Sequence, residues 1–368
     1  MRIIHCADLH LDSKMTANLS YEKAKERKAE LLITFNNMIR YAVEHSINAI
    51  IIAGDLFDTK NTSATARNTV YEAIQNHPNI LFYYLKGNHD ADVFLSRLET
   101  IPDNLKMFSD RWVSYIVNDN THNNITVTGI ELDKNNIVSA SDTLTLDHNK
   151  FNIVVLHGQE MEHQTKDRAE VIALRSYRNK GIDYMALGHL HSYKEASLDA
   201  RGVYCYPGCL EGRGFDECGE HGFVLLTINE ETKECKRSFI PIARRELFTV
   251  TIDISTLLTT PEILSHIRAT LQKKQLSCSS LVKIVLTGQV DLECEKDIDY
   301  MAKELDNDYY FLKIYDRTEI KVNYSDYELD ESLKGEFIRT VKDSDNLSEE
   351  DKAMIIFYGI QALQGKEI

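Results

Sequence analysis

The chain has 368 residues, of which 43% are hydrophobic, and a formal net charge of −15. This length is enough for two domains and a further small element. No stretch has the apolar length of a membrane span, and the chain starts directly with an apolar strand pattern instead of a signal sequence, so we expect neither a membrane protein nor a secreted one. Seven scattered cysteines without a C-x-x-C pair favour the reducing cytoplasm.

The negative charge is concentrated in the C-terminal third. Residues 246–368 hold 24 acidic and 14 basic side chains, a net of −10, and the remainder has a net of −5. Proteins that bind nucleic acids are usually basic. This distribution does not exclude DNA at the N-terminal part, but it argues against strong unaided binding through a broad basic face.

Apolar runs alternate with helical patterns in the first half of the chain. Residues 21–45 and 62–77 carry apolar side chains at helical spacing. Short apolar runs bounded by turns predict buried strands; these are Ile3–Ala7, Ala49–Ala53, Ile80–Leu85, Ile153–Leu156 and Tyr184–Leu187. The alternation predicts an α/β sheet, in which ligands gather beyond the carboxyl ends of the strands.

Two antiparallel hairpins are predicted after the third strand. Residues 112–117 pair with 125–130 in the first hairpin, and residues 223–228 pair with 237–242 in the second. The segments that carry candidate site residues have ended at Arg245. We therefore take residues 1–245 as one domain.

Residues 246–329 are predicted to form a small α+β domain. Its strands are expected at 248–252, 282–286 and 310–315, and its helices at 261–274 and 294–305. The tail, residues 330–368, predicts a helix pair, and Ser348 followed by Asp351 resembles a capping box at the start of the second helix. That helix is unusually apolar, so it packs on its own domain or serves as a docking surface for a partner.

Five short polar segments follow the ends of apolar runs. They combine histidine, aspartate or asparagine with turns, and they are Asp8-Leu9-His10, Gly54-Asp55-Leu56-Phe57-Asp58, Gly87-Asn88-His89-Asp90, His157-Gly158 and Gly188-His189-Leu190-His191. Because the carboxyl ends of parallel strands meet at one edge of a sheet, we expect all five at a single site. Chance explains any one segment, but it is a poor explanation for five in order.

The residue types in these segments indicate a two-metal phosphoesterase. Histidine, carboxylate and amide ligands suit Mn²⁺, Fe²⁺ or Zn²⁺, and the absence of thiolates argues against a structural zinc site. Two such ions side by side are the usual machinery of phosphoester hydrolysis, and Asp55 is placed to bridge them. No G-x-x-x-x-G-K-[ST] loop is present, so the chain is not expected to hydrolyse ATP itself.

Histidines outside these segments have simpler interpretations. His5 alternates into the sheet and is expected to pack there. His163 and His221 lie near the motifs in sequence, so a functional role stays open for both.

In this order, the five segments resemble the calcineurin-like metallophosphoesterase superfamily. Residues 8–13 and 54–58 are similar to the DNA repair exonuclease branch, the nuclease subunits of the SbcD kind, and residues 206–217 are similar to its YhaO-type relatives. The resemblance covers residues 1–245 well and the rest only in general architecture. It implies a metallophosphoesterase β-sandwich flanked by helices (α/β/β/α), followed by the α+β capping domain and the C-terminal helix pair.

The resemblance also implies a role for each site residue. One metal would be held by Asp8, His10, Asp55 and His191. The other would be held by Asp55, Asn88, His157 and His189. His89 would face the scissile phosphate and assist the leaving oxygen, with Asp90 orienting it. Asp58 would support a ligand histidine, although some family members have histidine at that position.

A two-metal-dependent DNA nuclease, with exonuclease or endonuclease action, is the function that the resemblance implies. The family usually uses Mn²⁺, while Fe²⁺, Zn²⁺ and Mg²⁺ stay open. It usually works with an SMC-like coiled-coil ATPase of the SbcC kind in DNA repair or processing, and residues 330–368 match in position the element that docks this ATPase. Homodimerisation is likewise implied.

Two other functions stay open. The first is a phosphodiesterase that acts on a nucleotide or other small phosphoester and uses the same chemistry. The second is an interaction protein whose catalytic site has decayed. A small-molecule enzyme does not need the extension after Arg245 or an apolar terminal helix, and the complete ligand set argues against a lost site.

Overall fold

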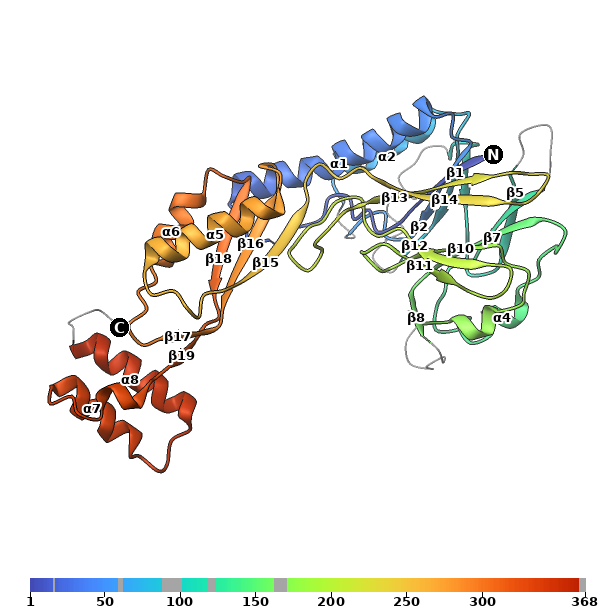
Figure 1. The fold of residues 1–368 in the computed structure, drawn as a ribbon. Coiled ribbons are helices and arrows are strands. Elements are labelled where there is room, and N and C mark those ends of the chain that lie inside the picture. The colour runs from blue at the N-terminus through green and yellow to red at the C-terminus, as the bar shows by residue number, and fades with distance from the viewer. Residues whose placement is uncertain (16, 59–61, 88–100, 118–123, 162–170, 364–368) are drawn as a thin grey trace. The chain divides into compact units, whose positions relative to one another are not determined.

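The computed structural model describes residues 1–15, 17–58, 62–87, 101–117, 124–161 and 171–363. The chain folds into two compact units, Met1–Glu246 and Leu247–Ile368 (Figure 1). The expected separation of residues 246–329 from 330–368 as distinct domains stays a prediction. Among the described residues, no helix is both long and apolar enough to span a membrane.

Two six-stranded sheets form the centre of the first unit. The first has the order β14-β13-β1-β2-β3-β4, made by Cys235–Pro241, Gly222–Ile228, Arg2–Cys6, Ala49–Ala53, Leu81–Leu85 and Leu105–Met107. The second has the order β11-β12-β10-β7-β6-β5, made by Lys194–Ser197, Val203–Tyr206, Tyr184–Gly188, Phe151–His157, Ile125–Gly129 and Val113–Ile116. The neighbouring strands β1 to β4 run parallel, and so do β12, β10, β7 and β6.

Both predicted hairpins are confirmed. β5 pairs with β6 and β13 pairs with β14, each pair antiparallel. A further short parallel pair, β8 (Gln159–Met161) with β9 (Val171–Ala173), lies outside the two sheets.

The two sheets pack face to face, and helices cover their outer faces. Alternate side chains of a strand point to opposite faces, so Ile3 of β1 lies in the core between the sheets and Ile4 lies against the helices. The first sheet is covered by α1 (Tyr21–Glu44) and α2 (Ala64–Gln75), and the second by the short α4 (Ala140–Thr143) and the 3₁₀ helix η1 (Leu174–Tyr177) (Figure 1). The predicted α/β/β/α layering is thereby confirmed.

The second unit begins with a small parallel sheet. Its order is β15-β16-β18, made by Leu247–Asp253, Leu281–Thr287 and Phe311–Asp316. Helices α5 (Thr260–Lys274) and α6 (Ile298–Leu305) connect these strands and share a core with them. Parallel strands need such crossover connections.

A short strand pair and a helix pair complete the second unit. β17 (Gln289–Asp291) pairs with β19 (Glu319–Lys321), followed by the 3₁₀ helix η2 (Tyr324–Tyr327). Helices α7 (Leu333–Lys342) and α8 (Glu349–Leu363) then pack together around a separate small core (Figure 1). The start of α8 is capped as expected, because the Asp351 N–H donates to Ser348 Oγ at 3.1 Å.

Candidate metal centre

Six of the predicted site residues lie at the ends of four strands, at one edge of the first unit. Asp8 and His10 follow β1, Asp55 follows β2, His157 ends β7, and the segment with His189 and His191 follows β10. β1 and β2 are parallel neighbours in one sheet, and β7 and β10 are parallel neighbours in the other. Nδ1 of His157 lies 2.9 Å from the Ala53 carbonyl oxygen, which joins the two sheets at this edge.

The third segment cannot be placed in the same way. The predicted site residues Asn88, His89 and Asp90 lie outside the described residues. Gly87, which precedes them, is described and lies against Asp55, because a Cβ on Gly87 would come within 2.2 Å of Asp55 Oδ1. The segment therefore starts beside the carboxylate that we predict to bridge the metals.

Two overlapping groups of ligand atoms occur among the described residues. Asp8, His10 and His191 form one group, and Asp8, Asp55 and His157 form the other, with all ligand atoms of a group within 4.8 Å of one another. Asp55 Oδ2 lies 3.7 Å from His10 Nε2 and 3.4 Å from His157 Nε2. Asp55 thus stands between a histidine of each group.

His189 contributes to the site through both its backbone and its ring. Its backbone N–H donates to the Asp8 carboxylate at 2.9 Å. Its ring lies edge-on to the ring of His157, with the ring centres 5.6 Å apart. The segment after β10 is therefore tied to the segment after β1, across the two sheets.

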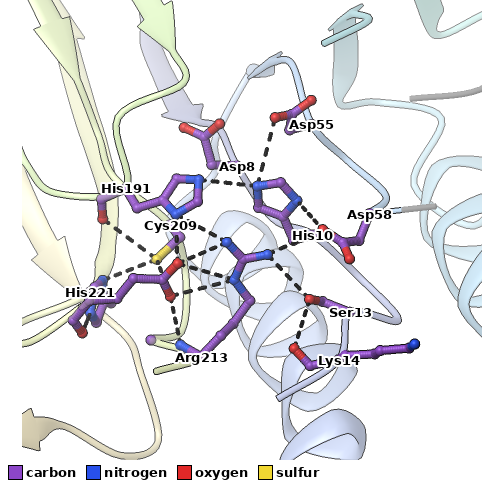
Figure 2. Close-up of polar contacts among 12 residues, drawn as sticks. Asp8, His10, Ser13, Lys14, Asp55, Asp58, His191, Cys209, Arg213 and His221 are labelled. Carbon is purple, nitrogen blue, oxygen red and sulfur yellow. Dashed lines mark hydrogen bonds and ion pairs between the residues drawn. The ribbon is translucent and has the colours of Figure 1, made fainter. Parts of the chain in front are cut away.

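The rings of His10 and His191 face each other with paired nitrogens (Figure 2). Their Nε2 atoms lie 3.2 Å apart. On the opposite side of each ring, Nδ1 meets a carboxylate oxygen: Asp58 Oδ1 at 3.1 Å from His10, and Glu217 Oε1 at 2.6 Å from His191. A carboxylate only accepts, so the two carboxylates favour the neutral tautomer with the proton on Nδ1 and a lone pair on Nε2, although Arg213 Nη2 also lies 3.1 Å from His191 Nδ1.

His157 has the same arrangement on the other side of Asp55. Its Nδ1 faces the Ala53 carbonyl, which only accepts, so Nε2 of the neutral ring presents a lone pair toward the Asp55 carboxylate. Lone pairs that face each other in a buried site are unfavourable without a cation between them. The donor set therefore fits divalent metal ions, and Nδ1 contacts of this type orient metal-binding histidines in proteins.

The backbone at the site is held in uncommon conformations. Asp8, His10, Asp55 and His189 have φ angles of +51°, +43°, +51° and +109°. Left-handed conformations of residues other than glycine cost of order 1–3 kcal/mol each and cluster at functional sites. The rest of the fold offsets this strain and thereby fixes the directions of these side chains.

Gly54 permits the close approach of the two sheets. Its φ is +94°, and a Cβ at this position would lie 2.1 Å from His157 Nδ1. Only glycine has no Cβ and adopts this conformation readily. The turn after β2 can therefore place Asp55 beside the His157 ring.

Burial and neighbouring charges shift the pKa values at the site. Burial raises the pKa of Asp8 to about 7, with His157 acting in the opposite direction. Burial alone would lower the pKa of His157, but the Asp55 and Asp8 carboxylates raise it to about 9. The metal-free site therefore favours bound protons at positions that bound cations would occupy.

The sequence interpretation missed Arg213 and Glu217. Glu217 accepts from His191, and Arg213 donates to both Glu217 and Asp58. Both residues lie in the loop after β12, a parallel neighbour of β10, so this loop leaves the sheet at the same edge. Residues 203–206 were not among the predicted strands, so the strand-end pattern did not extend to this loop.

Of the two histidines left open, His221 lies behind this loop, while His163 lies outside the described residues. His221 Nε2 lies 2.8 Å from the Glu217 carbonyl oxygen, and its Nδ1 lies 3.3 Å from Cys209 Sγ. His221 therefore supports the backbone of Glu217. His5 is buried as expected, beside the Tyr184 hydroxyl at 2.9 Å, and burial lowers its pKa to about 3.

The chain matches the model of a known protein family. The model of the family "Calcineurin-like phosphoesterase" matches residues 1–193, more than half of the chain. Among solved structures, a dimetal phosphatase from Danio rerio is 11% identical, with coverage of 62% of this chain and 93% of that chain and a TM-score of 0.41. A TM-score this low adds nothing to the family match.

Curated relatives are similar at low identity. The uncharacterized metallophosphoesterase YhaO of Bacillus subtilis is 26% identical, over 62% of this chain and 57% of that protein. The DNA double-strand break repair protein Mre11 of Methanosarcina acetivorans is 23% identical, over 69% of this chain and 41% of that protein. A subunit of the nuclease SbcCD of Escherichia coli is 30% identical, over 27% of this chain and 24% of that protein. The chain thus spans between about a quarter and rather more than half of these relatives.

Proposed function

The chain belongs to the calcineurin-like phosphoesterase family of metal-dependent hydrolases, and from this premise we propose that it is a two-metal-dependent nuclease acting on DNA phosphodiester bonds. The observation that carries the proposal is the convergence of histidine nitrogens and carboxylate oxygens at one strand edge. His10, His191 and His157 all direct Nε2 toward the space around Asp55 and Asp8.

The proposed ligand sets are those expected from the sequence. Asp8, His10, Asp55 and His191 would hold one ion, and Asp55, Asn88, His157 and His189 the other. Mn²⁺ is the metal that we propose, because histidine, carboxylate and amide ligands suit it. When bound, the two metal ions would supply a nucleophile activated near neutral pH and would neutralise charge that develops on the phosphoryl oxygens.

The side chains of the protein then have separate tasks. Asp58 and Glu217 fix the ring orientations of His10 and His191 through Nδ1. His89 is proposed to protonate the leaving oxygen, and Asp90 to orient His89. The buried positions of Asp8 and Asp55 keep competing water away from their carboxylates.

DNA is the proposed substrate for two reasons. Relatives with similar sequences include a DNA double-strand break repair protein and a nuclease subunit. The chain also continues for a whole further unit, Leu247–Ile368, which phosphoester hydrolysis alone does not need. A phosphodiesterase for a nucleotide or other small phosphoester is the second candidate, and the net charge of −15 favours it because it weakens unaided DNA binding.

The second unit offers a surface for a partner that would compensate for this charge. Met354, Ile355, Tyr358 and Leu363 of α8 are between 39% and 51% exposed. We propose that α7 and α8 dock an SMC-like coiled-coil ATPase of the SbcC kind, and that the protein can also form a homodimer. The cytoplasm is the proposed compartment, because the seven cysteines all lie in described segments and form no disulfide there.

Cleavage of end-labelled linear DNA with Mn²⁺ tests the proposal. The assay runs beside bis(p-nitrophenyl) phosphate, with and without a purified ATPase of the SbcC kind. We expect the wild type to cut DNA and His89→Gln to bind Mn²⁺ without turnover. Turnover of the small diester with DNA intact, even with the ATPase present, would support the second candidate instead. Loss of metal from His89→Gln would contradict the role of His89.

A further inference from the structure

We propose that Arg213 couples the two carboxylates that orient His10 and His191, so that these two histidines are positioned as one unit (Figure 2). The inference rests on the proposed metal centre. It adds a positioning residue, whose Nη2 also lies 3.1 Å from His191 Nδ1. The two sides of its guanidinium group contact different carboxylates.

One side of the guanidinium faces Asp58, the carboxylate beside His10. Arg213 Nη1 lies 3.3 Å from Asp58 Oδ1, the same oxygen that lies 3.1 Å from His10 Nδ1. The same Nη1 donates to Ser13 Oγ at 3.2 Å. Asp58 Oδ1 is therefore shared between the histidine and the arginine, and a movement of either changes the position of this oxygen.

The other side of the guanidinium faces Glu217, the carboxylate beside His191. Arg213 Nη2 donates to Glu217 Oε1 at 2.8 Å, and Nε lies 3.2 Å from the same oxygen. The Arg213 backbone N–H donates to Glu217 Oε2 at 2.7 Å. Glu217 Oε1 is also the oxygen that lies 2.6 Å from His191 Nδ1. Both carboxylates are thus fixed by one rigid planar group.

The loop that carries Arg213 is held by a buried hydrogen-bond network that contains none of the proposed metal ligands. Arg27 Nη2 donates to the Gly212 carbonyl at 2.8 Å and to Glu211 Oε2 at 3.0 Å. Thr34 Oγ1 donates to Glu211 Oε1 at 2.6 Å. The arginine backbone therefore has a fixed position from which its side chain spans the two carboxylates.

Coupling of the two carboxylates through Arg213 and independent action of their charges predict different effects on the dissociation constant of a bound cation. Two independent carboxylates would stabilise a bound cation additively, so their separate losses would multiply in the dissociation constant. If Arg213 couples them, loss of one carboxylate releases the guanidinium and loosens the other. The double variant then loses less affinity than the product of the single losses, because residues in one network are not additive.

A double-mutant cycle in Mn²⁺ binding tests the proposal on the full-length protein. Asp58→Asn and Glu217→Gln are measured singly and together by calorimetry, with equilibrium dialysis for stoichiometry, in three backgrounds. These are the wild type, Arg213→Gln, and the matched control Arg201→Gln. Arg201 makes a two-pronged ion pair with Asp183, at the opposite end of β10 from His189.

In the wild-type background we expect each single variant to weaken one of two Mn²⁺ sites by about tenfold. The double variant should lose clearly less than the roughly hundredfold product. In Arg213→Gln the two losses should multiply, and in Arg201→Gln the coupling should match the wild type. Thermal unfolding of the metal-free variants checks the fold, and Glu217→Asp replaces Glu217→Gln in the cycle if the latter does not fold.

The outcomes separate this proposal from the proposed function. Multiplying losses in the wild-type background, or coupling that persists in Arg213→Gln, would overturn the role of Arg213 alone. A wild type that binds fewer than two Mn²⁺ ions would overturn the metal centre, and the coupling with it.

Discussion

Nε2 of His10 and Nε2 of His191 lie 3.2 Å apart, although 181 positions separate the residues in sequence. His10 follows a strand of the first sheet and His191 a strand of the second. Each ring is fixed from behind by a different carboxylate, Asp58 or Glu217. The two sheets therefore have to be packed in register before this pair of nitrogens can form a ligand site.

Metal binding should stabilise the fold. A ligand that binds only the native state adds RT ln(1 + [L]/Kd), about 2.7 kcal/mol per site at a concentration one hundred times Kd. We expect excess Mn²⁺ to raise the unfolding temperature measured by circular dichroism, and a chelator to reverse the shift. An unfolding temperature that is independent of both would contradict a metal site made of buried ligands.

Asp55→Asn should remove both ions and activity together. Asp55 Oδ2 lies within 3.7 Å of a histidine of each ligand group, and an amide loses the negative charge that holds two cations close together. Metal content by elemental analysis should fall from two ions to fewer than one per chain. Retention of one tightly bound ion would show that Asp55 serves a single site.

Mn²⁺ affinity should rise with pH between pH 6 and 8. His157, whose pKa is raised to about 9, and Asp8, whose pKa is raised to about 7, must release protons before they bind a cation. Affinity should therefore increase by up to about tenfold per pH unit for each proton displaced. Calorimetry in buffers of different ionisation enthalpy counts these protons, and binding without proton release would contradict the assignment.

Without metal, the same two groups should make the fold less stable as pH rises. Both folded pKa values exceed the ordinary values of 3.8 and 6.5, so the native state holds more protons than the unfolded state. Their contribution is present at low pH and is lost from about pH 4 to 7 for Asp8 and from about pH 6.5 to 9 for His157. Urea unfolding with a chelator at several pH values measures this slope, which should be smaller in His157→Asn.

Gly54→Ala should disrupt the site more than backbone strain alone predicts. The new Cβ would lie 2.1 Å from His157 Nδ1, in addition to the cost of a positive φ. Gly219→Ala is the matched control, because Gly219 has φ of +105° and no atom within 4 Å of a Cβ. We expect a loss of about 1 kcal/mol or slightly more in the control and a clearly larger loss, with weakened Mn²⁺ binding, in Gly54→Ala. Equal losses would contradict the steric argument.

Arg27→Met should be among the most destabilising single changes. The Arg27 side chain is 1% exposed and pairs with Glu30 and Glu211, which are also buried. Removal of Arg27 leaves the buried Glu211 carboxylate without its arginine, while Glu30 keeps Arg245, and loss of one partner of a buried pair costs about 3–5 kcal/mol. The control Arg201→Met, at a pair that is more accessible to solvent, should cost less than about 1 kcal/mol in urea unfolding. Similar losses in both variants would argue against a buried network.

The sequence by itself predicted the candidate ligand residues and the α/β class of the first unit. Polar segments at the ends of apolar runs identified Asp8, His10, Asp55, His157, His189 and His191, which the structure brings to one edge. This worked because strand ends and turns are encoded by neighbouring residues, and because parallel strands present their carboxyl ends on the same side. The patterns predicted an α/β sheet, and the α/β/β/α layering followed from the family resemblance.

Only the tertiary structure decided how these ligands are oriented. Glu217 and Arg213 reach His191 and Asp58 from a loop that the sequence analysis noted only for its similarity to YhaO-type relatives. The parallel order of β15, β16 and β18 likewise depends on crossovers through α5 and α6. Ring orientation and tautomer are set by contacts between residues up to about 200 positions apart, as from Arg213 to Ser13. Such contacts arise from the packing of whole sheets and loops, which periodicity and spacing do not specify.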